Sequence, residues 1–154
     1  MADLETRKLG STGLDATVLG FGAMELRGPK SPIPKGRPID PVQAESTLNS
    51  ALDSGINLID TSIDYGESEG LIGRFVSHRR SEYILASKCG CNADTEAVET
   101  GNAERHVYTK ENIIAGVELS LKRLNTDYLD LLQFHGSPPP ELREEAVQAL
   151  QALK

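Results

Sequence analysis

The 154-residue sequence predicts an α/β fold built around a parallel sheet. Short apolar runs alternate with segments whose apolar residues recur at helical spacing. This alternation is the pattern of parallel strands joined by right-handed helical crossovers. Polar residues also close several of the apolar runs, and a parallel barrel gathers such strand-end residues at one rim.

The chain opens with a predicted hairpin. Residues 7–9 and 15–18 flank the glycine-containing turn at 10–13, a pattern typical of two short antiparallel strands. We expect residues 17–22 to form the first strand of the main sheet. Residues 26–40 carry four of the eight prolines and are predicted to form a loop.

The first helix is predicted from its ends. Asp40 suits the N-cap, Pro41 suits the first helical position, and Gly55 is a stop signal. The inward face of this helix is expected to hold Leu48, Ala51 and Leu52.

Three further strand and helix cycles follow. The predicted strands cover residues 56–60, 83–87 and 128–134, and the predicted helices cover 68–77, 109–124 and a last segment from Leu142 to Leu153. A polar loop is expected between Cys89 and Tyr108.

Two parallel architectures fit this alternation, the open doubly wound sheet and the TIM-type (β/α) barrel. The open sheet is usually marked by a glycine fingerprint, but Gly20-Phe21-Gly22 has no third glycine and no helix begins directly after it. The sequence therefore favours a barrel type, with the first four β/α units and the amino-terminal hairpin present.

Composition excludes several classes of partner. The net charge of -7 arises from 16 basic and 23 acidic residues without long runs of either sign, which disfavours nucleic acid and anionic membrane surfaces. No run of about 18 apolar residues occurs. We expect a cytoplasmic protein with Cys89 and Cys91 as free thiols in a loop and with no metal site.

The candidate site consists of residues that close or follow the predicted strands. Asp60, Lys88 and His135 each end an apolar run, and Tyr65 lies on the loop after the second strand. An isolated phenol has a pKa of about 10, so it needs help to act as a proton donor at neutral pH. A neighbouring ammonium stabilises the phenolate, a carboxylate holds the ammonium, and a histidine can orient a carbonyl substrate.

The whole chain resembles the amino-terminal half of the aldo-keto reductases, which are eight-stranded barrel enzymes that use NADPH. The resemblance rests on several motifs in the same order: Arg7-Lys8-Leu9-Gly10, Leu19-Gly20-Phe21-Gly22, Gly55-Ile56-Asn57-Leu58-Ile59-Asp60-Thr61, Tyr65-Gly66, Ser68-Glu69, Ser87-Lys88, Thr126-Asp127-Tyr128-Leu129-Asp130 and Gln133-Phe134-His135.

The resemblance implies a role for each candidate residue in reducing an aldehyde or a ketone. Tyr65 would donate the proton, Lys88 and Asp60 would support it, and His135 would orient the substrate. Gly22, Ala23, Met24 and Asp60 would lie near the nicotinamide and its ribose. Residues 1–154 would form the amino-terminal half of this NADP-dependent domain.

Two other interpretations remain open from the sequence. The chain could be a non-catalytic half barrel that assembles with a second copy or another partner through open sheet edges. It could also be a truncated gene product or a portion of a longer reductase. His78 and His106 are expected at the surface, Arg79 and Arg80 are expected to be solvated, and the acidic residues Glu141, Glu144 and Glu145 are expected on an exposed helix face.

Overall fold

A four-stranded parallel sheet organises the protein, as the alternation predicts. The computed structural model describes residues 4–33 and 36–154; residues 1–3 and the loop positions Pro34 and Lys35 lie outside the described residues. The sheet has the order β3-β4-β5-β6. Its strands are β3 (Phe21–Gly22), β4 (Leu58–Asp60), β5 (Ile84–Cys89) and β6 (Leu131–Phe134). A separate antiparallel hairpin pairs β1 (Thr6–Lys8) with β2 (Asp15–Thr17).

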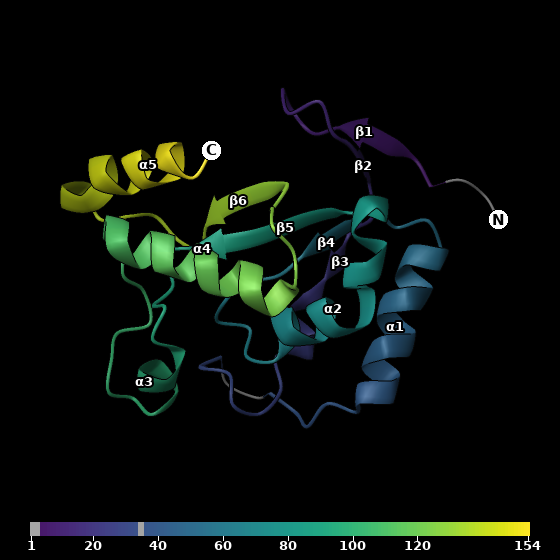
Figure 1. Cartoon of the computed structure of the whole chain (residues 1–154), viewed down its shortest axis with the longest axis horizontal. Coiled ribbons are helices and arrows are strands. Elements are labelled where there is room, and N and C mark those ends of the chain that lie inside the picture. Colours follow the sequence, from purple (N-terminus) through teal and green to yellow (C-terminus); the bar gives the residue numbers. More distant parts are fainter. Residues whose placement is uncertain (1–3, 34–35) are drawn as a thin grey trace.

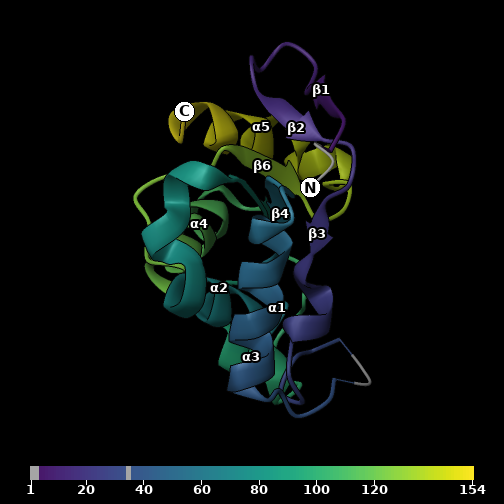
Figure 2. The same ribbon diagram turned by 90° about the vertical axis from the view of Figure 1, so that its right-hand side faces the viewer.

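Helices follow the strands of the parallel sheet. The α-helices are α1 (Pro41–Asp53), α2 (Ser68–Val76), α3 (Thr95–Glu99), α4 (Lys110–Leu124) and α5 (Arg143–Ala152), and the 3-10 segments are η1 (Ala23–Leu26), η2 (Ser77–Glu82) and η3 (Pro140–Leu142). Helices α1, α2 and α4 lie side by side along one face of the sheet, and α5 continues the row beside α4 (Figures 1 and 2). The other face carries no helix among the described residues.

Local sequence signals explain where the helices begin and end. The side chain of Asp40 accepts a hydrogen bond from the Val42 amide at 2.9 Å and Pro41 is the first helical residue, which confirms the predicted start of α1. Thr109 caps α4 in the same way, and Asn125 ends it in the left-handed conformation. Of the predicted inward residues of α1, Leu48 and Leu52 are buried, whereas Ala51 is half-buried and Ala44 takes the inward position instead.

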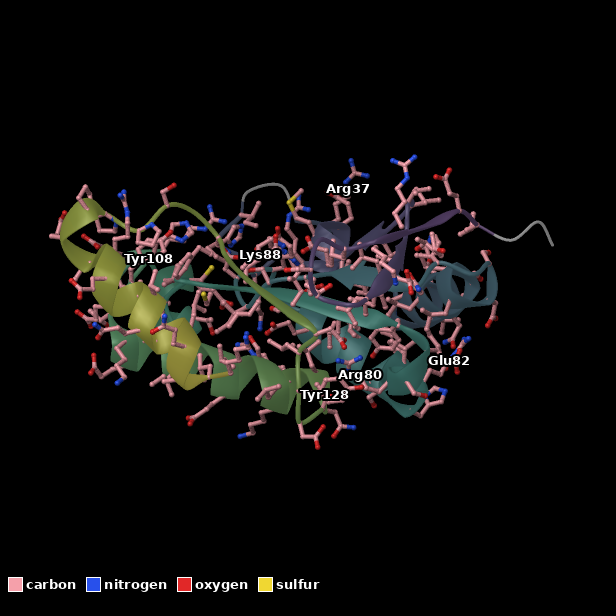
Figure 3. The ribbon with its side chains drawn as sticks, turned by 90° about the horizontal axis from the view of Figure 1, so that it is seen from above. Arg37, Arg80, Glu82, Lys88, Tyr108 and Tyr128 are labelled. Atoms are coloured by element: carbon pink, nitrogen blue, oxygen red, sulfur yellow. The ribbon has the colours of Figure 1, made fainter. Side chains whose placement is uncertain are left out.

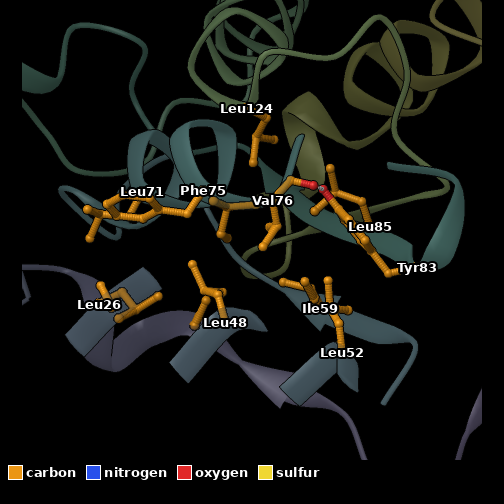
Figure 4. Packing of buried hydrophobic residues seen from close by; sticks show 13 residues of the cluster. Leu26, Leu48, Leu52, Ile59, Leu71, Phe75, Val76, Tyr83, Leu85 and Leu124 are labelled. Atoms are coloured by element: carbon orange, nitrogen blue, oxygen red, sulfur yellow. Dashed lines mark hydrogen bonds between the residues drawn. The ribbon is translucent and has the colours of Figure 1, made fainter. Parts of the chain in front are cut away.

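The main core fills the layer between the sheet and the helices α1, α2 and α4. Ile59 and Leu85 reach it from the centre of the sheet, and Leu48, Val76 and Leu124 meet them from the helices (Figure 4). Helix α2 approaches α4 so closely at Gly73 that a Cβ there would overlap the carbonyl oxygen of Arg123. Glycine therefore sets the packing distance between these two helices.

A second core lies under α4 and α5. It is formed by apolar side chains from β5, β6, the two helices and the loop before α4, including Cys89, Tyr108, Ile113, Val117, Ala146 and Ala149. Strand alternation directs Leu132 and Phe134 of β6 into this core, while Leu131 and Gln133 lie on the opposite face. The last helix thus packs through the stripe that its periodicity predicts.

The prediction of a continuous strand over residues 17–22 is wrong. Thr17 belongs to the hairpin strand β2, and the parallel sheet begins only at Phe21. Between them Val18 and Leu19 are 54% and 55% exposed, so this apolar run is not buried as a core strand would be. Asn57 instead attaches the hairpin to the sheet, because its side chain accepts from the Thr17 amide at 2.7 Å and donates to Asp15 O at 2.9 Å.

Arg79 and Arg80 are not solvated, contrary to the sequence-based expectation. Arg80 lies 2.6 Å from Asp130 Oδ2, donates to Tyr83 O and stacks 3.9 Å from the centre of the Tyr128 ring. Arg79 pairs with Asp53 and Glu82. Arg80 and Tyr128 lie together at the end of the sheet opposite Lys88 and Tyr108 (Figure 3). Arg80 therefore links the segments just before β5 and β6, and Arg79 links η2 to α1.

Among residues 4–33 and 36–154, no helix has both the length and the apolar content needed to cross a membrane.

Candidate active site

Asp60 and Lys88 form an ion pair on the helix-free face of the sheet. Asp60 ends β4 and Lys88 lies near the end of β5, one strand away. Lys88 Nζ lies 2.6 Å from Asp60 Oδ2 and donates to Thr61 O at 2.9 Å. The Lys88 side chain is only 14% exposed while Asp60 is 38% exposed, so the ammonium is held in place and the carboxylate stays in contact with solvent.

Tyr65 and His135 lie beside this ion pair. The Lys88 ammonium lies 4.9 Å from the centre of the Tyr65 ring, and the His135 ring meets the same ring at 5.5 Å in an edge-on arrangement. His135 directly follows β6, and its amide donates to Cys89 O at 2.9 Å, which extends the pairing with β5. The structure therefore brings together all four residues that the sequence predicts for catalysis.

The predicted cofactor residues occupy the neighbouring edge strand and the turn after it. Gly22 pairs in register with Asp60 and has open space where a side chain would stand. Met24 is exposed, whereas Ala23 is buried and its carbonyl accepts from Ser68 Oγ at 3.0 Å. The open surface here is thus provided by Gly22, Met24 and Asp60.

Asp64 is a site residue that the sequence reasoning missed. It lies on the same loop as Tyr65 and is buried. Its Oδ1 lies 3.2 Å from His135 Nδ1 and accepts from Ser62 Oγ at 2.8 Å, while its Oδ2 pairs with Arg105 Nη2 at 2.6 Å. A buried carboxylate thus links the histidine of the site to an arginine from the loop before α4.

The surroundings of Asp64 keep it ionised. Burial alone would raise the pKa of this carboxyl. This effect is outweighed by hydrogen bonds from His135, Arg105 and Ser62 and by the positive charge of His135. Together they hold the pKa of Asp64 well below its usual range.

Cys89 and Cys91 are free and buried. The free thiols are as predicted, but Cys89 is the last residue of β5 rather than part of a loop. Burial raises the pKa of Cys89 to about 11 and that of Cys91 to about 12, so both thiols stay protonated at neutral pH.

Cys91 Sγ lies 3.1 Å from His135 Nδ1, and the polar atoms of Asp64, Cys91 and His135 all lie within 4.8 Å of one another. The contacts of His135 with Asp64 and Cys91, and the ion pair of Asp64 with Arg105, explain why these three side chains gather here.

His106 extends the aromatic wall of the site and is not the surface residue that the sequence predicts. Its ring stacks with Tyr108 at 6.3 Å and meets His135 edge-on at 5.6 Å. Burial and the nearby Arg105 charge lower the pKa of His106. His78, in contrast, is exposed as expected.

Glu69 is a second buried carboxylate, placed on the helix side of the sheet. Ser87 Oγ donates to its Oε1 at 3.0 Å, and Arg123 lies 3.8 Å from its Oε2. Burial raises the pKa of Glu69 despite these partners. The pKa of Asp64 is thus lowered and that of Glu69 is raised, although the two carboxylates are only five positions apart in the sequence.

Comparison with known proteins gives a consistent picture. The family model described as "Aldo/keto reductase family" matches residues 18–154. The uncharacterized oxidoreductase YqkF of Bacillus subtilis is 34% identical over 153 residues, which cover 98% of this chain and 45% of YqkF. L-galactose dehydrogenase of Arabidopsis thaliana is 33% identical over 162 residues, which cover 100% of this chain and 46% of that enzyme.

Solved structures agree with the sequence relatives. The holo form of the aldo-keto reductase AKR11C1 from Bacillus halodurans superposes with a TM-score of 0.80 and 31% identity, over 98% of this chain and 46% of that chain. The chain spans about half the length of the curated relatives it matches, and its four parallel strands correspond to a partial barrel. The family match, the relatives and the shared fold show that this chain belongs to the aldo/keto reductase family of oxidoreductases.

Proposed function

We propose that this chain provides the catalytic half of an NADPH-dependent reductase of aldehydes or ketones, with Tyr65 as the proton donor. The observation that carries the proposal is the position of the Lys88 ammonium, which lies 2.6 Å from Asp60 and 4.9 Å from the centre of the Tyr65 ring. A phenol next to a fixed cation is suited to give up a proton, because the cation stabilises the phenolate left behind.

Each of the other two residues supports Tyr65 in a different way. Asp60 offsets the cost of placing the Lys88 ammonium in a largely buried position, and the Thr61 carbonyl fixes the direction of that ammonium. His135 lies at the edge of the Tyr65 ring, where a hydrogen bond from it would hold a carbonyl oxygen close to the phenol.

The open part of the site fits the nicotinamide end of the cofactor. Gly22 leaves room for a flat group beside the strand edge, and Asp60 presents a half-exposed carboxylate that can accept from a ribose hydroxyl. The exposed Met24 offers apolar contact next to it. NADPH, when bound, supplies the hydride that reaches the carbonyl carbon. We infer a cytoplasmic setting because the two free thiols fit a reducing compartment.

A second candidate is a non-catalytic half barrel that pairs with another copy of itself. Strands β3 and β6 are the edges of the parallel sheet, and Leu58 and Leu131 on its helix-free face are only half-buried. Such edges and apolar groups favour association. Light scattering after size-exclusion chromatography would give a dimer mass for this candidate, and a well-folded monomer would exclude it.

The reductase proposal is tested by adding NADPH to the protein and then an aromatic aldehyde. We expect a saturable change in NADPH fluorescence, followed by aldehyde-dependent loss of its absorbance. Tyr65→Phe should reduce the rate by at least about 100-fold, in the range of general acid catalysis, while leaving the fluorescence titration unchanged.

The matched control is Tyr83→Phe, which removes the hydroxyl of another buried tyrosine on the helix side of the sheet. It should keep the wild-type rate. Absence of any saturable NADPH signal, or full activity in Tyr65→Phe, would refute the proposal for this chain.

A further inference from the structure

The Nδ1 atom of His135 is surrounded by three polar atoms. Asp64 Oδ1 lies at 3.2 Å, Ser62 Oγ at 3.1 Å and Cys91 Sγ at 3.1 Å. A neutral imidazole carries only one N–H, so Nδ1 is either a donor or an acceptor. Which of the two it is depends on whether these three neighbours have protons to donate.

Two of the three neighbours can only accept a hydrogen bond from Nδ1. Asp64 is an ionised carboxylate held by Arg105 and has no proton to give. Ser62 has a single hydroxyl proton and donates it to Asp64 Oδ1 at 2.8 Å, so its oxygen faces His135 as an acceptor. A lone pair on Nδ1 would therefore face the lone pairs of both neighbours.

The third neighbour does not reverse this conclusion. Cys91 is protonated but is a weak donor, and its Sγ also lies 3.7 Å from Ser62 Oγ, which has a lone pair free to accept. The thiol proton is thus accommodated without a lone pair on Nδ1, and the sulfur can act as a further weak acceptor.

We propose that Asp64 is a positioning residue that keeps the ring proton of His135 on Nδ1. This inference rests on the proposed function. With its proton on Nδ1, a neutral His135 has only a lone pair on Nε2, so it donates to a carbonyl oxygen only after a second proton converts it to imidazolium. Carbonyl reduction that uses this donor therefore requires a doubly protonated His135.

The charged and titratable groups around His135 come from three loops. Asp64 and Tyr65 follow β4, Cys91 follows β5, and Arg105 and His106 precede α4. Asp64 is the group in this set that supplies a negative charge, and Arg105 contacts its far oxygen rather than the histidine.

The proposal is tested on the full chain without cofactor or substrate, by long-range ¹H–¹⁵N NMR of the histidine rings. The chain has only three histidines, so His78→Gln and His106→Gln assign the His135 signals by elimination. Spectra are recorded at rising pH until the ring of His135 is neutral. We expect the protonated nitrogen of that neutral ring to be Nδ1 and the downfield, unprotonated nitrogen to be Nε2.

Asp64→Asn then tests whether Asp64 is responsible. The amide oxygen of the new side chain will face the Arg105 guanidinium, and its NH₂ will donate to His135 Nδ1, which must then accept. The two ¹⁵N signals should exchange, with the proton now on Nε2, as expected when an amide replaces the carboxylate of an Asp–His pair. The matched control Ser62→Ala leaves Asp64 in place and should keep the wild-type pattern.

An Nε2–H ring in the neutral wild type would overturn the proposal, and so would an Nδ1–H ring retained in Asp64→Asn. If Asp64→Asn does not fold, Asp64→Ala combined with Arg105→Ala removes the whole ion pair, and Ser62 becomes free to donate to Nδ1 with the same expected exchange.

A pH profile of carbonyl reduction gives a second readout. The wild-type rate should fall as His135 loses its second proton, whereas Asp64→Asn, with Nε2–H already present in the neutral ring, should lack that fall. An identical fall in both proteins would contradict the positioning role. The NMR outcome depends on neither NADPH nor turnover, so failure of the reductase proposal would be distinguishable from failure of this one.

Discussion

The two faces of the parallel sheet differ in what they contribute. Ile59 and Leu85 point from neighbouring strands into the helix-covered core and are fully buried. Asp60 and Lys88 come from the same two strands on the opposite face, and Gln133 of β6 joins them there in a hydrogen-bonded polar group. Because alternate residues of a strand face opposite sides, one strand can serve packing and chemistry at once.

This difference separates the stabilising core from the candidate active site within a few residues of sequence. The apolar face gains free energy in proportion to the area it removes from water. The polar face is held by an ion pair that remains partly exposed, and such pairs contribute little to stability. We therefore expect substitutions on the two faces to have different consequences.

Leu85→Ala should produce the largest loss of stability. The side chain is fully buried in the centre of the main core, and such truncations cost about 2–5 kcal/mol. Leu131→Ala, its matched control on the helix-free face of the next strand, should cost only about 1 kcal/mol because that side chain is half-buried. Urea unfolding measures the loss of stability in both variants, and equal losses would contradict the difference between the two faces.

Asp64→Asn should change how stability depends on acid. The pKa of Asp64 is lowered in the folded protein, so its stabilisation is present above the unfolded carboxyl pKa of about 3.9 and is lost as pH falls. The variant should be less stable at neutral pH and should lose less stability on acidification. Urea midpoints between neutral and acid pH would reveal this, and parallel curves for the two proteins would contradict it.

Glu69→Gln should act in the opposite direction and with a smaller effect. The pKa of Glu69 is raised by burial, so the folded protein loses stability as pH rises above the unfolded carboxyl pKa of about 4.3 and through the folded value. Glutamine keeps an oxygen for Ser87 but cannot ionise. Stability relative to wild type should therefore increase with pH, and a constant difference would show that Glu69 does not titrate in this way.

Much of this architecture is predictable from sequence because its signals are local. Neighbouring residue types predict three of its features: the start of α1 at Asp40-Pro41, the buried apolar stripe of α4 and the polar residues at the strand ends. Asp60, Tyr65, Lys88 and His135 are brought together as predicted because parallel strands align their carboxyl ends at one rim.

The predictions that were wrong concern residues whose positions depend on contacts between distant segments. Val18 and Leu19 have the composition of a buried strand, but the hairpin and Asn57 direct the chain away from the sheet there. Arg80 acquires its partners 48 and 50 residues later in the chain. Such pairings are not visible in a local pattern.

Asp64 was missed for the same reason, since its partners Arg105 and His135 are remote in sequence. One signal was available: an acidic residue directly before the candidate proton donor, on a short loop after a strand. The same topology that aligns the predicted tetrad also places this loop beside His135.

The measurement that most directly tests the separation of the two faces is the free energy of unfolding of Lys88→Met. Methionine keeps the apolar stem, and the Asp60 carboxylate left behind is exposed enough to be solvated by water. The account predicts a value within about 1 kcal/mol of wild type, together with loss of the proposed carbonyl reduction. A loss as large as that of Leu85→Ala would contradict it, because Lys88 would then be a structural residue of the sheet.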